Sequence, residues 1–178
     1  MRIVGVDPGI NGGLCFMTDG VVNAVVKTPT YAYTVGSGKK LKKKKMLDAE
    51  IVGELIKKFN PHAVYIEKVG GMPGQGITST FNFGFVTGMV HGICGALKIK
   101  VTTVRPQEWK KVILENEDHD KDAAIGFCQQ NFPDVNLLPT KRSTEPHDGM
   151  AESICIAIFG LKNEINKINT TGDSTNEG

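Results

Sequence analysis

Short apolar runs typical of strands alternate with longer repeats at helical spacing along this 178-residue chain. β-branched and apolar runs predict strands at 3–6, 14–17, 21–26, 63–66 and 99–104. Apolar residues spaced for one helix face predict helices at 46–59, 78–98, 121–131 and 147–162, with a short helix after Pro106. Residues 28–45, rich in Thr, Tyr, Gly, Ser and Lys, are interpreted as a long exposed connection. This order of elements predicts an α/β domain, in which α-helices flank a mixed central β-sheet.

No repeat or composition shift divides this pattern, so we expect a single domain over residues 1–162 and a polar, disordered tail over 163–178. No apolar stretch approaches the roughly 20 residues of a membrane-spanning helix. A strand follows Met1 almost at once, so we expect no signal or transit peptide, no membrane association and a cytoplasmic location. The four cysteines lie singly in apolar segments, which argues against a structural zinc site and predicts buried thiols.

Two of the predicted strands end in a carboxylate. Asp7 follows the run at 3–6 and precedes Pro8-Gly9, whereas Glu67 follows the run at 63–66 and precedes a glycine-rich stretch. An ionised acid beside β-branched residues is costly unless a cation or hydrogen-bond donors meet it. Asp-Pro-Gly is also favourable turn chemistry, so local features alone explain Asp7 equally well as a turn residue or as a metal ligand.

A second pair of acids begins the last predicted helix. Asp148 and Glu152 are four residues apart and share one helix face, and the apolar run 154–159 predicts that this helix is buried. Like charges at that spacing repel, so the pair is best explained by a divalent cation between it and the strand acids. The alternative is that Asp148 caps the helix and Glu152 lies on a rim. Carboxylate donors favour Mg²⁺, with Mn²⁺ as a substitute.

Three segments, in chain order, resemble the RuvC family of Holliday junction resolvases. They are Ile-Val-Gly-Val-Asp-Pro-Gly at 3–9, Val-Tyr-Ile-Glu at 64–67 and His-Asp-Gly-Met-Ala-Glu-Ser at 147–153. The stretch from Glu67 to Phe-Asn-Phe-Gly, together with Pro-Gln-Glu-Trp-Lys at 106–110, is similar to the phage and chloroplast branch of that family. The resemblance implies a ribonuclease H-like fold over nearly the whole chain up to Leu161.

The resemblance also implies that four acids are the catalytic metal ligands: Asp7, Glu67, Asp148 and Glu152. The turn interpretation is then kept for Pro8 and Gly9 and given up for Asp7. The sequence departs from the family at Glu152, where many relatives have Asp; the charge is retained, but the reach is longer. His147 would assist the attacking water or orient a carboxylate, although it is equally well explained as the residue that starts the helix.

The activity implied is that of a homodimeric, Mg²⁺-dependent endodeoxyribonuclease without a small-molecule cofactor. It would cut four-way DNA junctions symmetrically in recombination and repair, leaving 5′-phosphate ends, in a bacterial or phage-infected cell. The glycine-rich helix at 78–98 offers an apolar face for the dimer. Two alternatives stay open. One is another ribonuclease H-like nuclease acting on branched DNA or RNA, and the other is a non-catalytic junction-binding protein, although a pure binder gains nothing from clustered acids near phosphates.

Affinity for DNA phosphates should come mostly from basic side chains. The candidates are Lys39, Lys40, Lys42, Lys43, Lys44, Lys45, Lys68, Arg105, Lys110, Lys111, Lys141 and Arg142. The lysine cluster at 39–45 is alternatively a solvated loop.

By resemblance, the loop after Glu67 inserts into the junction centre. There Gly70 and Gly71 permit close backbone approach, Met72 is a candidate wedge between bases, and Gln75 could contact a base edge. The aromatic residues Phe81, Phe83 and Trp109 are interpreted as packing residues.

Overall fold

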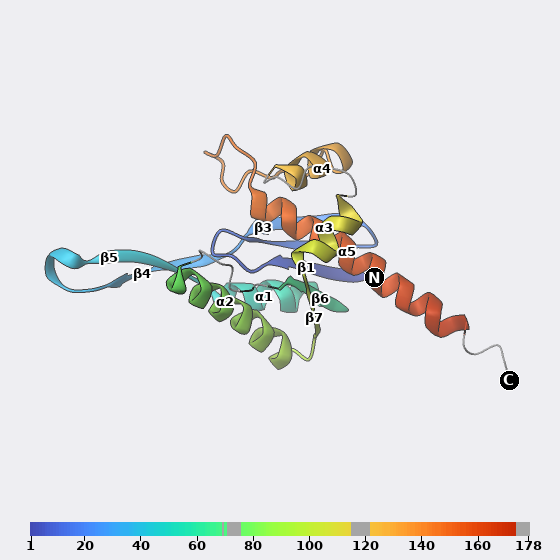
Figure 1. The fold of residues 1–178 in the computed structure, drawn as a ribbon, viewed down its shortest axis with the longest axis horizontal. Coiled ribbons are helices and arrows are strands. Elements are labelled where there is room, and N and C mark those ends of the chain that lie inside the picture. Colours follow the sequence, from blue (N-terminus) through green and yellow to red (C-terminus); the bar gives the residue numbers. More distant parts are fainter. Residues whose placement is uncertain (69, 71–75, 115–121, 174–178) are drawn as a thin grey trace.

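The computed structural model describes residues 1–68, 70, 76–114 and 122–173 (Figure 1). Its strands are β1 (Arg2–Asp7), β2 (Gly13–Thr18), β3 (Val21–Lys27), β4 (Thr30–Val35), β5 (Lys42–Leu47), β6 (Ala63–Glu67) and β7 (Lys100–Val104). Its α-helices are α1 (Ala49–Phe59), α2 (Ile77–Ala96), α3 (Pro106–Ile113), α4 (Ala123–Asn131) and α5 (Asp148–Asp173), and a single 3₁₀ turn, η1, covers Gly38–Lys40. Within these residues, no helix is both long enough and apolar enough to cross a bilayer.

The central sheet has five strands in the order β3-β2-β1-β6-β7. Strands β1, β2 and β3 pair antiparallel, whereas β6 and β7 add parallel to β1. The sheet is therefore mixed, as the sequence predicted. The parallel strands place the carboxyl ends of β1 and β6 side by side, which is the edge of an α/β sheet where binding sites usually form.

The sheet separates two apolar cores. One core joins alternate residues of the sheet, such as Ile3 and Tyr65, to α3, α4 and α5, with Trp109 and Ile154 among its buried members. The other joins the opposite side chains, such as Val4, to α1 and α2. This is the three-layer arrangement visible in Figure 1. The inner strands β1, β2 and β6 are apolar on both faces because helices cover both.

Residues 28–45 are not the irregular connection that the sequence predicted. Strands β4 and β5 pair antiparallel into a separate two-stranded sheet, which projects from the body of the molecule (Figure 1). The positive φ angles of Gly36 and Gly38, 97° and 53°, allow the chain to reverse at the tip. The lysines of β5 hid this strand from the sequence pattern, because consecutive lysines have low strand propensity and no apolar alternation.

The C-terminal segment also differs from the prediction, because α5 does not end at Lys162 and runs on to Asp173. Glu164 anchors the added turns: its carboxylate accepts hydrogen bonds from the Tyr65 hydroxyl at 2.7 Å and from the Lys167 ammonium at 2.7 Å. Lys100 of β7 lies 3.3 Å from the same carboxylate oxygen. These contacts fix a helical stretch whose polar composition suggested disorder. Residues 174–178 lie outside the described part.

The four cysteines are buried free thiols, as predicted.

Candidate active site

The register of the sheet brings the two strand acids together. Val6 of β1 pairs with Ile66 of β6, so Asp7 and Glu67, the next residue of each strand, emerge side by side at the sheet edge. Asp7 is the last residue of β1, and the β1–β2 turn follows it. The Gly12 amide closes this turn by donating a hydrogen bond to the Gly9 carbonyl at 2.9 Å. Two neighbouring strand ends therefore deliver two carboxylates to one place, as the sequence predicted.

Glycines let the last helix approach the sheet closely enough to add its own acids. A Cβ placed on Gly5 of β1 would lie 2.2 Å from the carbonyl oxygen of Ser153, so only glycine permits this contact between strand and helix. A Cβ on Gly149 would lie 2.6 Å from the Asn11 carbonyl oxygen and 2.7 Å from Oδ2 of Asp7. The first turn of α5 thus packs directly against the β1–β2 turn.

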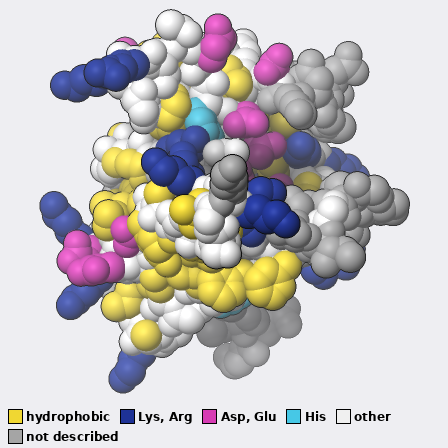
Figure 2. All heavy atoms as spheres, turned by 90° about the vertical axis from the view of Figure 1, so that its left-hand side faces the viewer, with side chains coloured by type: hydrophobic (Ala, Val, Ile, Leu, Met, Phe, Trp, Pro, Cys, Tyr) yellow, Lys and Arg dark blue, Asp and Glu magenta, His cyan; other side chains and the backbone are white. Residues whose placement is uncertain are grey.

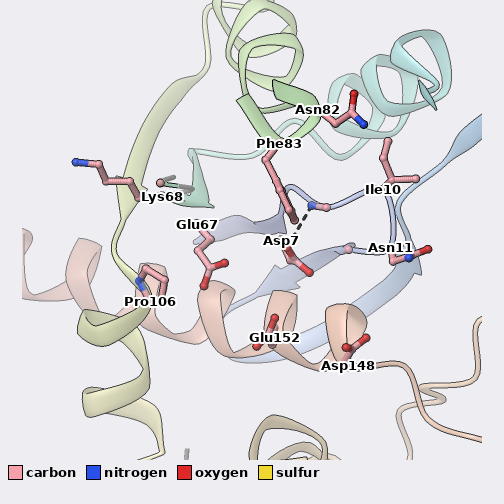
Figure 3. Close-up of a pocket in the computed structure, with 13 residues that line it drawn as sticks. Asp7, Ile10, Asn11, Glu67, Lys68, Asn82, Phe83, Pro106, Asp148 and Glu152 are labelled. Carbon is pink, nitrogen blue, oxygen red and sulfur yellow. Dashed lines mark hydrogen bonds between the residues drawn. The ribbon is translucent and has the colours of Figure 1, made fainter. Parts of the chain in front are cut away.

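All four predicted acids line one cleft of about 510 Å³. Figure 3 shows Asp7 and Glu67 above and Glu152 and Asp148 below, on α5, all directed toward the same space. The complete lining comprises Asp7, Gly9, Ile10, Asn11, Gly12, Glu67, Lys68, Gly70, Asn82, Phe83, Pro106, Asp148 and Glu152. The prediction that Asp148 and Glu152 share one face of a buried helix is confirmed.

Burial and mutual repulsion make the cleft unfavourable for negative charge. Burial, followed by the charges of Glu152 and Glu67, raises the pKa of Asp7 to about 8. Burial also raises the pKa values of Glu67 and Glu152 above those of free carboxyls, and the charge of Glu67 adds to the rise at Glu152. Three carboxylates that resist ionisation together form a site that a cation would strongly stabilise.

Asp7 has a second role, which the sequence analysis had set aside. Its Oδ1 accepts a hydrogen bond from the Gly9 amide at 3.2 Å, which is the contact of a turn-forming aspartate. This bond lowers the pKa of Asp7, against the stronger effect of burial. The turn and the acid site are therefore two functions of one side chain.

Helix α3 holds two of the acids in position. Trp109 is fully buried, and its indole N–H donates to Oε1 of Glu67 at 2.9 Å. The ammonium of Lys110 lies 3.6 Å from Oε1 of Glu152 and 5.3 Å from the centre of the Trp109 ring. The prediction that Trp109 packs in the core is confirmed. Its hydrogen bond to an acid of the site is an additional role that the sequence alone did not indicate.

The donor set fits hard divalent cations, because four carboxylates line one cleft and burial desolvates three of them, Asp7, Glu67 and Glu152. As the side chains stand, however, no group of three or more His, Cys, Asp or Glu side chains in the described residues is arranged to hold a metal ion. Trp109 and Lys110 currently occupy one oxygen each of Glu67 and Glu152.

His147 begins α5 rather than lining the cleft. Its Nδ1 accepts a hydrogen bond from the Met150 amide at 3.3 Å, three residues along the helix, as an N-cap residue does. Burial and the charge of Lys27 lower its pKa, which favours the neutral ring that can accept this bond. Asp148 follows it as the first helical residue, and its carboxylate is mostly exposed. The structure thus supports the helix-start interpretation of His147.

Most of the basic residues predicted to contact DNA fall into three groups. Lys68 lies at the cleft, as does Gly70. The lysines at 40 and 42–45 lie on the projecting hairpin, and Lys141 and Arg142 are exposed in the segment before α5. Figure 2, which looks onto the hairpin end of the molecule, shows basic side chains on both sides of the acidic ones near its centre. The side chain of Lys39, and all of Gly71, Met72 and Gln75, lie outside the described residues.

The start of α2 contributes residues that the sequence analysis placed in the core. Phe83 lines the cleft beside Asp7 and Asn82 (Figure 3), and Phe81 is 67% exposed. The core interpretation of these two rings is therefore wrong. Asn11 and Pro106 also line the cleft unpredicted. Asn11 lies just after the Asp7 motif in the sequence, which was the one available signal for it, whereas Pro106 is distant in the sequence from all the acid motifs.

A scan against protein-family models finds no match for this chain, and a search of curated proteins finds none either. Among solved structures, the chain is similar to a structure of RuvC from Thermus thermophilus, with a TM-score of 0.55 and 17% identity over 93% of this chain and 97% of that one. A structure of T. thermophilus RuvC in complex with a Holliday junction substrate gives 0.54 and 16% identity over 89% and 91%. The chain therefore has the ribonuclease H-like fold of RuvC-type resolvases, which confirms the predicted fold class.

Proposed function

We propose that this protein is a Mg²⁺-dependent endonuclease that resolves four-way DNA junctions. The observation that carries the proposal is the cleft itself: four carboxylates, from two strands and one helix, line one cleft at the carboxyl edge of the sheet. The likeness of the fold to a RuvC captured with a Holliday junction substrate supports the choice of branched DNA. The three sequence segments that resemble this family are those that carry the four acids.

Asp7, Glu67, Asp148 and Glu152 would hold the metal ions. Divalent ions at such sites stabilise charge on a phosphodiester and activate water for in-line attack. Asp7 supplies a carboxylate that the Gly9 amide orients at the end of β1. The indole of Trp109 orients the carboxylate of Glu67.

Lys110 and Lys68 would serve the substrate. Lys110 lies 3.6 Å from Glu152 in the described conformation, and this ammonium becomes available to a phosphate when Glu152 turns toward an ion. Lys68 lines the cleft and is exposed, so it can contact the strand that enters. The negative field of the cleft itself repels DNA, and basic side chains around it are needed to compensate.

We further propose that a homodimer forms through α2. Gly84, Gly88 and Gly92 are exposed at every fourth position, and a Cβ on any of them would meet nothing within 4 Å. Phe81 and Phe85 continue the same face, and their rings stack at 6.1 Å. A helix face of glycines and exposed aromatics costs helix stability and leaves apolar surface in water, unless a second copy packs against it. Two copies would present two clefts for symmetric cuts.

A substrate panel tests the proposed function. End-labelled four-way junction, replication fork, linear duplex and RNA–DNA hybrid are incubated with Mg²⁺, with Mn²⁺ and with EDTA, and the cut positions are mapped on denaturing gels. We expect paired nicks at symmetric positions of the junction, and no products in EDTA. Preferential cutting of the hybrid or the fork would assign the cleft to another branched or RNA substrate. Junction binding without cutting in either metal would identify a non-catalytic binder.

A further inference from the structure

The hairpin of β4 and β5 concentrates positive charge without compensation. Seven lysines and no acid lie between Gly20 and Leu47. Lys40 and Lys42 to Lys45 are exposed, and no ion pair involving them occurs among the described residues. Consecutive lysines on a two-stranded sheet with no core of its own repel one another, and such sheets are marginal in isolation. A polyanion bound to the hairpin would remove that repulsion.

The register divides the hairpin into two different faces. Tyr33 pairs with Lys44 and Val35 pairs with Lys42, and cross-strand partners share a face. Tyr31 lies on this face too, since its ring contacts that of Tyr33 with centroids 6.2 Å apart. This surface is called the tyrosine face below.

The opposite face of the hairpin has a different composition. It presents Lys43 opposite Thr34 and Lys45 opposite Ala32, with no aromatic side chain. Each face therefore carries two lysines of β5, so the two faces have equal charge. Only the tyrosine face has aromatic side chains. Tyr31 is 50% exposed. Tyrosine and lysine are both common donors to DNA phosphates, and the rings can also lie against sugars.

The base of the hairpin is fixed at the rim of the cleft. The amide of Thr28 donates to the carbonyl of Gly12 at 3.0 Å, and Gly12 lines the cleft. The amide of Asp48, just after β5, donates to the carbonyl of Pro29 at 2.9 Å and closes the base. From there the two six-residue strands extend outward, and a rise of about 3.3 Å per residue gives about 20 Å, or roughly six base pairs of duplex. A duplex whose scissile phosphate lies in the cleft would continue along this ribbon.

We infer that the β4–β5 hairpin is a DNA-binding arm, which grips one duplex arm of the substrate outside the cleft through its tyrosine face. The inference rests on the proposed function for the kind of nucleic acid, and it adds a second contact and a direction to that function. Lysines on the free edges of a hairpin can also serve only to prevent strand pairing between molecules, which predicts no preference for one face.

Two charge-matched double variants test the inference. K42Q/K44Q removes two charges from the tyrosine face, and K43Q/K45Q removes two from the opposite face. Dissociation constants for a four-way junction are measured in EDTA over a range of salt concentrations, and circular dichroism and thermal melting are compared between the variants. We expect K42Q/K44Q to weaken binding at least tenfold and to reduce the salt slope by about 1.8, and K43Q/K45Q to weaken it less than threefold. A third variant, Y31T/Y33T, should weaken binding severalfold with an unchanged slope.

Equal losses from the two faces would overturn the inference, because they would mean unspecific attraction by net charge. Unchanged binding in all three variants would also overturn it and would leave edge protection as the role of the lysines. The outcome is independent of cleavage. If the wild type binds and the faces differ but no DNA is cut, the hairpin inference stands and the proposed nuclease function fails. If junctions are cut and the faces do not differ, the inference alone fails.

Discussion

Asp7 shows how a single residue can serve the fold and the site together. Its Oδ1 accepts the Gly9 amide, as turn chemistry requires, while its Oδ2 lies near Gly149 at the first turn of α5. From the sequence, a role in the turn and a role as metal ligand were competing explanations of Asp7, because each was sufficient alone. The two roles are compatible because one oxygen of the carboxylate serves the turn and the other faces the cleft side of α5.

The raised pKa of Asp7 predicts an unusual pH dependence of stability without metal. The pKa of this carboxyl is about 8 in the folded state and 3.8 in the unfolded state. Between these two pH values the carboxyl is protonated in the folded protein and ionised in the unfolded chain. The folded state therefore binds more protons at this group, so the contribution of Asp7 to stability is greatest below pH 4 and is lost as the pH rises toward 8. Asp7→Asn removes this loss. In EDTA, we expect its Tm to exceed that of the wild type by about 10 °C at pH 9 and to match it near pH 4.

The matched control for this melting experiment is Glu54→Gln, which neutralises an exposed acid on α1. Its Tm should follow the wild type at every pH. Saturating Mg²⁺ should also reduce the difference between the wild type and Asp7→Asn at high pH. A constant offset between the two proteins from pH 4 to pH 9 would contradict the assignment of the titrating group.

Trp109→Phe tests whether the indole positions Glu67 or only fills the core. Phenylalanine keeps an apolar ring but removes the N–H that donates to Oε1 of Glu67. We expect the Mg²⁺ concentration for half-maximal cleavage to rise severalfold and the rate at saturating Mg²⁺ to fall about tenfold, with junction binding in EDTA unchanged. A lower Tm with an unchanged Mg²⁺ titration would reduce Trp109 to a packing residue.

At the scale of elements, the sequence pattern predicted the regular helices and the core strands. The strands at 3–6 and 63–66 and the helix at 78–98 follow from clear periodicity, and the acid motifs lie at their ends. The hairpin was missed because its stability comes from pairing register and two glycines at the tip rather than from an apolar pattern. The extension of α5 was missed because Glu164 gains its partners, Tyr65 and Lys100, from distant parts of the chain.

Gly88→Leu tests the proposed dimer face on α2. Leucine has a higher helix propensity than glycine by about 1 kcal/mol, and the space around Gly88 is open, so the monomer should fold at least as well. In the dimer, the added side chain would separate the paired helices. We expect a monomer in analytical ultracentrifugation at concentrations where the wild type is dimeric, together with loss of paired cuts.

Gly126→Leu is the matched control for the dimer experiment. Gly126 lies on the exposed side of α4, where a Cβ also meets nothing within 4 Å. This variant should remain dimeric and should still cut both strands. If Gly88→Leu stays dimeric and cuts both strands as well, the proposal that α2 forms the interface is wrong.

At the scale of the whole molecule, basic side chains lie on both sides of the acidic ones (Figure 2), and the hairpin projects from the body of the molecule (Figure 1). The sequence predicted the four acids of the cleft, because each motif joins an acid to a strand end or to a helix start. It did not predict Phe83, Asn82 or Pro106, whose positions depend on how α2 and α3 pack against the sheet. Sequence motifs therefore predict the acids of the cleft, whereas the other residues that line it depend on tertiary packing.

The most direct test of the central claim compares the wild type with Asp7→Asn on one labelled four-way junction. Cleavage is measured on denaturing gels in Mg²⁺ under single-turnover conditions, and binding is measured in EDTA. The account predicts that Asp7→Asn cuts at least about 10³-fold more slowly, because a ligand of the metal site is lost, while its dissociation constant stays within threefold of the wild type. Glu54→Gln should retain both properties. Cleavage by Asp7→Asn at a rate near that of the wild type would contradict the account.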